Sequence, residues 1–406
     1  MHRIRGVWAF IKRQKKPFKV NMVRVSLNTL LSSLTQQYQS VYIVEKGATP
    51  FELGLLNSLG GLAGASISPV SGWFADRYGI KKSLMLGTIL TALASFIFAE
   101  APTWAYMIPA MLLFMLATRI LMTSCPMVCG SYLKNEERAT GMQLCDTLSA
   151  VPGIFSPLVA AAIITRFGGL KPEGIRPLYY IQFVGFILVF LFIAKEYNDL
   201  PEIRNIKSSV RLFAGMREVL KEGVAVKQWI LCMSLSTLSF FTSSTYLPLF
   251  IKEVKGGDQY VLGAMATASM LIPLALAIPT GRLADSIGRK KVIYITTFVY
   301  CLSLILVIYA SNPAFLIFSG FLQGFWMLAG VTQGAMSAEL VPTRLLGRWY
   351  GLLGVFRGII SVVAPLVGGL IWSAVSPTHV LTFIILAQVL KLFVLWSMIP
   401  ETLKVS

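Results

Sequence analysis

GWFADRYGIKK at residues 72–82 and GRLADSIGRKK at residues 281–291 are two copies of one pattern. Each copy reads Gly-x-x-Ala-Asp-x-x-Gly, then one further residue and two lysines, and each stands between two long apolar stretches. The copies lie about half a chain length apart. A charged turn at the same place in two apolar halves indicates a duplicated membrane bundle, which is typical of a carrier.

The composition supports a membrane location. The 406 residues are 55% hydrophobic and 13% charged, and their mean hydropathy is +0.70. Soluble domains carry about 25% charged residues, so a soluble domain is excluded. A helix needs about 20 mostly apolar residues to cross the hydrocarbon layer. Such stretches predict twelve spans, at residues 22–44, 53–75, 83–100, 104–132, 139–165, 178–195, 229–251, 261–281, 291–310, 313–335, 347–375 and 379–399.

The formal net charge of +18 is distributed unevenly over the predicted loops. If both termini are cytoplasmic, most basic residues lie on the cytoplasmic side. Those left outside are Lys46, Arg166, Lys171, Arg176, Lys252 and Lys255. This asymmetry follows the positive-inside rule. We therefore attribute the basicity to topology and to membrane lipids with anionic headgroups, and we expect no nucleic-acid partner.

Further matches extend the repeat along the chain. SPLVAA at 156–161 corresponds to APLVGG at 364–369, and both copies lie within predicted spans. We expect a basic cytoplasmic N-terminus (1–20), an N-terminal six-helix bundle (21–195), a cytoplasmic linker (196–227), a C-terminal six-helix bundle (228–400) and a cytoplasmic tail (401–406).

The two turns, the arginine in the fourth span and the Pro-x-x-small-small element of spans five and eleven together resemble the major facilitator superfamily. The first turn is most similar to its drug-efflux antiporter branch. The resemblance covers practically the whole chain. It implies an all-α membrane protein of two pseudo-symmetric six-helix bundles that gives alternating access to a central cavity.

The resemblance also implies a gating role for the turns. In the family, the matching aspartate contacts the N-terminal end of span eleven, whose partial positive charge favours an anion, and losing that contact opens the cytoplasmic side. Asp285 would contact span five in the same way. The gating residues carried over are Asp76, Arg77, Gly79, Asp285, Gly288 and Arg289. The alternative is that both turns are solvated loops that only set the topology.

Ionisable residues inside the spans are functional candidates, because a charge at mid-bilayer costs about 2.5–3.5 kcal/mol on insertion scales. Arg119 lies deep in span four, where family members often carry an arginine linked to substrate or proton coupling. Asp146 lies in span five, at a depth that differs from that of Arg119 by roughly 9 Å. We predict that the two form a proton-switchable coupling pair. The alternative for Arg119 is a structural cation.

Two more cations lie within predicted spans. Arg357 lies on span eleven at nearly the depth of Asp146 on span five, and it either faces the cavity or braces span two. Lys391 lies on span twelve, and we expect its long side chain to reach the headgroups.

Polar residues on spans one, seven and ten complete the predicted substrate site. Span one carries amides at helical spacing, which are costly to expose to hydrocarbon. In the family, spans one, four, seven and ten surround the cavity. The predicted substrate-binding residues are Asn28, Gln36, Gln39, Arg119, Tyr246, Gln323, Trp326 and Arg357. The alternative for the polar residues is hydrogen bonding between helices.

No motif of an enzyme is present. The chain has no phosphate-binding Gly-rich loop with a lysine, and its two histidines lie near predicted membrane edges. Cys125 and Cys129 are spaced like metal ligands, but such residues usually act as apolar filler in membranes. We expect no cofactor, no metal and no catalysis.

The sequence predicts a monomeric, multi-pass secondary active transporter in the cell membrane that moves a small organic or amphiphilic solute. Protons are the expected coupling ion, and the first turn favours export. The alternatives are a lipid or amphiphile flippase of the same fold, an uptake facilitator and a non-transporting receptor.

Overall fold

A computed structural model describes residues 10–133, 138–198, 219–220, 223–342 and 345–402. Within these ranges the side chains of residues 67–76, 123–125, 130, 138–140, 143–144 and 146 are not described. All regular structure in the described ranges is helical. The chain forms two compact units.

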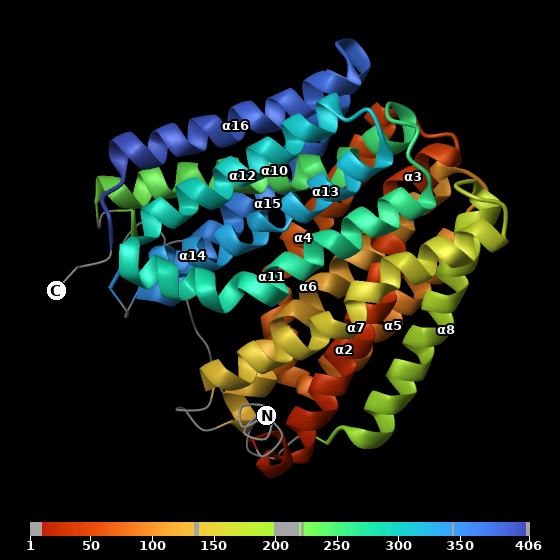
Figure 1. Cartoon of the computed structure of the whole chain (residues 1–406). Helices are drawn as coiled ribbons and strands as arrows, with labels where there is room; N and C mark the ends of the chain where they lie inside the picture. The colour runs from red at the N-terminus through yellow and green to blue at the C-terminus, as the bar shows by residue number, and fades with distance from the viewer. Residues whose placement is uncertain (1–9, 134–137, 199–218, 221–222, 343–344, 403–406) are drawn as a thin grey trace. The chain divides into compact units, whose positions relative to one another are not determined.

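The first unit contains the described residues of Met1–Gln36, Ser66–Gly168 and Glu173–Ser208. In this unit α2 packs against α6 and α7, and α5 packs against α6 (Figure 1). Its helices are α2 (Lys16–Gln36), the later part of α4 (Pro50–Tyr78), α5 (Ile80–Glu100), the short 3-10 helix η1 (Trp104–Tyr106), α6 (Met107–Tyr132), α7 (Arg138–Arg166) and α8 (Pro172–Glu196).

Small residues allow the helices of the first unit to approach closely. A Cβ atom at Gly153 of α7 would lie 2.8 Å from the methyl group of Thr29 on α2. Another at Gly87 of α5 would lie 2.7 Å from the side chain of Leu121 on α6. Glycine at such contacts is characteristic of membrane helices, which pack by van der Waals contact because lipid provides no hydrophobic driving force between them.

The second unit contains the described residues of Gln37–Ala65, Gly169–Pro172 and Ser209–Ser406. Here α10 packs against α15 and α16, and α12 packs against α13, α14 and α16. Its helices are α3 (Gln39–Glu45), the first part of α4, α10 (Val224–Glu253), α11 (Gln259–Ile287), α12 (Arg289–Tyr309), α13 (Pro313–Gln323), α14 (Phe325–Glu339), α15 (Leu346–Ala374) and α16 (Pro377–Met398).

The two copies of the repeated segment fold alike. α4 ends at Tyr78 and α5 begins at Ile80, and Gly79 between them has φ of +90°. α11 ends at Ile287 and α12 begins at Arg289, and Gly288 between them has φ of +102°. Only glycine adopts this region without steric cost. The glycine of the pattern is therefore required by the sharp turn between consecutive helices.

In the part of the chain that the structure describes, ten helices are long and apolar enough to cross a membrane. They correspond to the third to the twelfth of the predicted spans. The first predicted span is interrupted between α2 and α3 at residues 37–38. The second falls on α4, where residues 67–76 have no described side chains. The arrangement of twelve spans thus remains a prediction.

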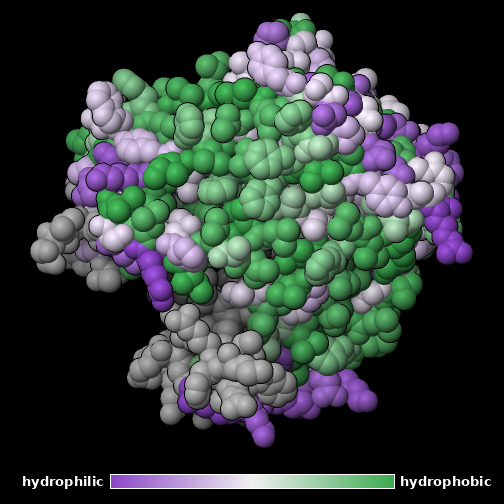
Figure 2. Space-filling view, viewed as in Figure 1, coloured by the Kyte–Doolittle hydropathy of each residue, from purple (hydrophilic) through white to green (hydrophobic). Residues whose placement is uncertain are grey.

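On the face of the molecule that Figure 2 shows, most side chains are apolar, and hydrophilic ones gather toward its margins. Ile278, Phe298 and Leu386 are each more than 60% exposed within candidate spans. Soluble monomers rarely expose continuous apolar surface on this scale. The exposed apolar sides of these helices are suited to contact with lipid.

Candidate functional site

The second repeated turn is held by a network of ion pairs in the second unit. Arg289 Nη2 lies 2.8 Å from Glu339 Oε1 at the end of α14 and 3.7 Å from Asp285 Oδ1 on α11. The Arg289 side chain is only 13% exposed, whereas that of Asp285 is 70% exposed. Arg289 therefore ties the turn to α14, and most of the Asp285 carboxylate stays solvent-accessible within this unit. The predicted contact of Asp285 with span five remains a prediction.

Glu401 completes this network and was not singled out from the sequence. Its carboxylate accepts hydrogen bonds from the backbone N–H groups of Arg289, at 3.2 Å, and Lys290, at 3.0 Å. A carboxylate at these first N–H groups of α12 also interacts favourably with the helix dipole. A Cβ atom at Gly288 would lie 2.8 Å from Glu401 Oε2. This glycine therefore provides both the turn and the space for the cap.

The first repeated turn is described in part. The side chain of Asp76 lies outside the described residues. Arg77 is exposed, and its guanidinium carbon lies 5.7 Å from the ring centre of Tyr78. The Nζ atom of Lys81 donates a hydrogen bond to the carbonyl oxygen of Ala194 at 2.8 Å. The gating roles proposed for Asp76, Arg77 and Gly79 remain predictions.

The predicted coupling pair lies in the first unit. Arg119 is half-buried on α6 and has no hydrogen bond or ion pair with a described residue. The side chain of Asp146 on α7 is outside the described residues. The structure therefore leaves Arg119 available for a partner, and the pairing with Asp146 remains a prediction.

The two further cations of the second unit differ in environment. Arg357 lies on α15 and is exposed. Lys391 is 1% exposed, and its Nζ atom donates a hydrogen bond to Thr297 Oγ1 at 2.9 Å. The prediction that Lys391 reaches the headgroups is therefore wrong. The reason is its position on the side of α16 that packs against α10 and α12.

The polar residues of the first predicted span surround a break in the helix. α2 ends at Gln36, which is exposed, and α3 begins at Gln39, which is half-buried. Asn28, farther back in α2, has a buried Oδ1 atom without a hydrogen-bond partner among the described residues. Buried polar atoms are nearly always satisfied. Asn28 Oδ1 is therefore available to a ligand, to water or to a side chain outside the described set.

Tyr246 is fully buried inside the second unit. Its hydroxyl group lies 2.7 Å from the carbonyl oxygen of Pro365 on α15 and 3.1 Å from that of Pro50, the first residue of α4. The ring packs against Trp372, with the ring centres 5.8 Å apart. These contacts favour a role in helix packing over direct contact with substrate.

Gln323 and Trp326 lie on either side of a second helix break, at Gly324 between α13 and α14. The indole ring of Trp326 stacks on Phe240 of α10, with ring centres 4.9 Å apart. The Nε2 atom of Gln323 is buried and has no partner among the described residues. An aromatic pair and a free amide donor are suited to an organic solute with both apolar and polar groups.

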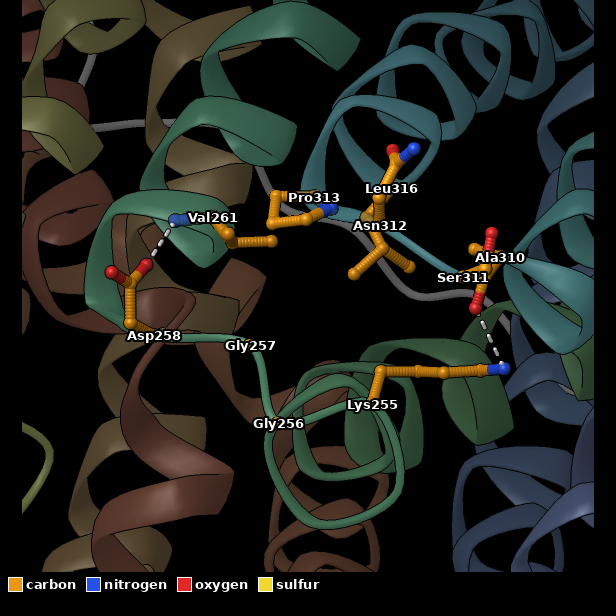
Figure 3. Close-up of a pocket in the computed structure, with 10 residues that line it drawn as sticks. All are labelled: Lys255, Gly256, Gly257, Asp258, Val261, Ala310, Ser311, Asn312, Pro313 and Leu316. Carbon is orange, nitrogen blue, oxygen red and sulfur yellow. Dashed lines mark hydrogen bonds between the residues drawn. The ribbon is translucent and has the colours of Figure 1, made fainter.

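A small cavity of about 180 Å³ lies between the loops that precede α11 and α13 (Figure 3). Lys255 lines it, and its Nζ atom donates hydrogen bonds to the carbonyl oxygens of Ile308, at 2.6 Å, and Ala310, at 3.1 Å. Asp258 lines it too and caps α11 by accepting from the N–H of Val261 at 2.9 Å. Ligand pockets are usually larger, at about 300–1,000 Å³. This cavity contains none of the predicted site residues, and its charged groups already serve the helix ends.

Residues 37–65 pack against the C-terminal helices within the second unit. We call this contact the α3/α4 seam. Glu45 forms an ion pair with Lys252, and Ser58 Oγ donates to the carbonyl oxygen of Val362 on α15. A Cβ atom at Gly61 would lie 2.7 Å from the carbonyl oxygen of Ser361. The seam comprises Tyr38, Glu45, Pro50, Gly54, Ser58 and Gly61 on one side and Tyr246, Lys252, Gln259, Ser361, Val362, Pro365 and Gly369 on the other.

The chain is similar in sequence to a protein family and to named proteins of that family. The Major Facilitator Superfamily profile matches residues 21–266 and 256–405. The Multidrug resistance protein MdtG of Salmonella arizonae is 25% identical over 380 residues, which are 88% of this chain and 89% of that protein. MdtG of Salmonella choleraesuis is 24% identical over 375 residues, with the same coverage.

Solved structures show the same fold at low identity. A point mutant of the nucleoside transporter NupG has a TM-score of 0.81 and 14% identity, covering 95% of this chain and 100% of that one. A D-xylose-proton symporter has a TM-score of 0.71 and 14% identity, covering 95% and 99%. The family comprises transporters and not enzymes. The chain belongs to the Major Facilitator Superfamily and is a multi-pass membrane protein.

Proposed function

We propose that the protein is a secondary active transporter that exports a small organic or amphiphilic solute by alternating access, coupled to protons. Two six-helix halves, residues 21–195 and 228–400, rock against each other around the linker at 196–227. Both termini are cytoplasmic, and the protein works as a monomer. The similarity to proteins named for multidrug resistance supports export of organic solutes.

The main observation that supports alternating access is the α3/α4 seam. The chain passes from the first unit to the second between residues 36 and 37, and it passes back between residues 65 and 66. The segment between these points is held to α10 and α15 by glycine contacts, a few hydrogen bonds and one ion pair. The seam is therefore suited to act as a gate that closes one side of the membrane.

The candidate site residues support a solute that is neutral, anionic or zwitterionic. Arg119 is a half-buried cation without an ion-pair partner among the described residues. Gln323 and Asn28 offer polar atoms that have no partner among the described residues, and Trp326 with Phe240 offers an aromatic surface. A site for a simple cation would instead be expected to contain a carboxylate as countercharge.

Ligand screening followed by transport tests this function. Binding raises the apparent thermal stability of purified protein by mass action, so a panel of organic acids, zwitterions and cations identifies probes. Carboxyfluorescein, ethidium and a fluorescent phosphatidylcholine then serve as the anionic, cationic and lipid probes in proteoliposomes. We expect carboxyfluorescein to move against its gradient when a proton gradient is imposed, and to exchange in counterflow.

The same assay separates the alternatives. Movement of the labelled lipid alone would replace transport of a solute with lipid flipping. Binding without counterflow would indicate a receptor. Accumulation of ethidium in place of the anion would overturn the proposed substrate class while leaving transport in place.

A further inference from the structure

Lys391 is a buried basic residue within a membrane-spanning helix, about two turns from the C-terminal end of that helix. It lies on α16, within the candidate span Pro377–Met398, and is among the largest fully buried side chains of the described chain. Its single hydrogen bond goes to the hydroxyl group of Thr297 on α12. Ionisable residues at such positions are costly and usually functional.

The surroundings of this amine contain no carboxylate among the described residues. The titratable groups that interact with it electrostatically are two buried thiols, Cys232 from α10 and Cys301 from α12. α15 also packs against α16 and adds no further such group in the described part of the chain. An ammonium ion here therefore lacks the countercharge that buried charges normally require.

Further buried polar groups lie on both sides of this position. Gln388 lies one helical turn before Lys391, away from the Gly288 turn, and neither its Oε1 nor its Nε2 atom has a partner among the described residues. Tyr294 lies one turn before Thr297, and its buried hydroxyl group likewise has no described partner. Tyr294 interacts electrostatically with Cys232 and with Glu401, the residue that caps α12. Thr297 and Tyr294 thus lie along α12 between Lys391 and the beginning of the helix, which Glu401 caps.

We propose that Lys391 takes up and releases a proton as part of the transport cycle, and so forms a proton site inside the C-terminal half. Loss of the proton leaves a neutral amine and so removes the cost of burying an unpaired ammonium ion. A proton site also needs no cavity, because the proton binds directly to the Nζ atom. In the release step one Nζ–H bond breaks, its electron pair stays on nitrogen, and the proton passes to a water molecule. Uptake is the reverse step. The inference rests on the proposed proton-coupled transport.

The protonation of Lys391 can be measured without a substrate. The full-length protein is labelled with ¹³Cε-lysine in lipid nanodiscs, and the Lys391 resonance is assigned by its loss in Lys391→Met. Exposed lysines stay charged below about pH 9, because their pKa is about 10.4. We expect the Lys391 resonance alone to shift between about pH 5 and 9. A resonance that stays in the ammonium form or in the amine form throughout this range would overturn the proposal.

Transport separates this inference from the proposed function. In proteoliposomes, Lys391→Met and Lys391→Arg should lose at least about 10-fold of probe-driven proton movement, because neither side chain exchanges a proton in this range. Both should retain probe binding. Lys255→Met removes a lysine that bonds helix-end carbonyl groups in the same unit, and this control should keep proton movement.

The remaining outcomes of the transport assay distinguish the failure of this inference from the failure of the proposed function. If the wild type couples protons and Lys391→Met does so equally well, Lys391 is not the proton site. If the wild type moves the probe without protons, the coupling and the role of Lys391 both fail. If the wild type moves no probe, the proposed transport fails, and the NMR titration alone decides whether Lys391 exchanges a proton.

Discussion

The phenol of Tyr246 on α10 donates a hydrogen bond to the carbonyl oxygen of Pro365 on α15 at 2.7 Å. The hydroxyl oxygen of Tyr246 also lies 3.1 Å from the carbonyl oxygen of Pro50 at the start of α4. One side chain thereby joins three helices of the α3/α4 seam. Its position suggests that the seam opens more easily when the hydroxyl group is absent.

Replacing Tyr246 by Phe should weaken the seam by about 1 kcal/mol, because the ring remains but its hydrogen bonds are lost. Ser58, which is buried in the seam, can be changed to cysteine in a background without the native cysteines. Alkylation of this cysteine by a maleimide reports opening, and we expect it to be about five-fold faster in Tyr246→Phe. Tyr309→Phe is the matched control, because Tyr309 is 79% exposed. Equal rates in the seam variant and the control would exclude a latch at Tyr246.

Gly369→Ala should destabilise the protein by about 1–3 kcal/mol through overpacking. The new Cβ atom would lie 2.8 Å from Tyr246 Oη and 3.0 Å from the Cα atom of Phe51. Gly354→Ala on the same helix meets nothing within 4 Å and should be neutral or slightly stabilising, because alanine favours helix. Thermal unfolding in detergent compares the two. A loss of stability of the same size in both variants would contradict the close packing at Gly369.

Glu401→Ala should remove the cap of α12 at a cost of about 1 kcal/mol. Hydrogen exchange read by mass spectrometry should then become about five-fold faster at the amides of Arg289 and Lys290, since local opening sets their protection. Glu52 accepts a hydrogen bond from the N–H of Thr49 at 2.7 Å before α4, so Glu52→Ala is the control. It should leave exchange at residues 289–290 unchanged. Unaltered exchange in Glu401→Ala would show that the cap contributes nothing to this turn.

Arg119→Ala should lower the affinity for an anionic probe at least about 10-fold, because a charge-assisted hydrogen bond contributes about 1.5–3 kcal/mol. Titration of probe binding to purified protein measures the loss. Arg282→Ala, at an exposed position on α11, should bind as the wild type does. Full affinity in Arg119→Ala would assign this arginine a structural role.

Asp146→Asn should make transport independent of the proton gradient while leaving probe binding intact, because the amide cannot exchange a proton. Probe accumulation in proteoliposomes at several imposed pH gradients measures the effect. Asp258→Asn removes a carboxylate elsewhere but keeps an acceptor for the N-cap of α11, and it should respond to the gradient normally. A normal response in Asp146→Asn would remove Asp146 from the coupling mechanism.

Local patterns predicted much of the fold. The repeated turn was recognisable because tight helix-to-helix turns need glycine, and Gly79 and Gly288 both adopt positive φ. Ten spans were predictable because helix length and apolar composition are properties of one segment. The breaks at residues 37–38 and at Gly324 were not predicted, since both lie inside apolar or mixed stretches that read as one helix.

The partners of the charged residues could not be predicted in the same way. Glu401 and Glu339 both contact the Gly288 turn from distant parts of the chain. No periodicity relates such residues to their partner. Tyr246 was assigned to the substrate site because its span lines the cavity in the family, yet its position on α10 turns it toward α4 and α15.

By itself, the sequence determined that this is a duplicated, helical membrane protein with a glycine-containing charged turn in each half. These properties depend on composition and on neighbours along the chain. Only the tertiary structure decided that Lys391 is buried and that residues 37–65 pack with the C-terminal helices. The side of a helix that faces protein and the side that faces lipid depend on which helices pack together, and in an apolar span both sides have nearly the same composition.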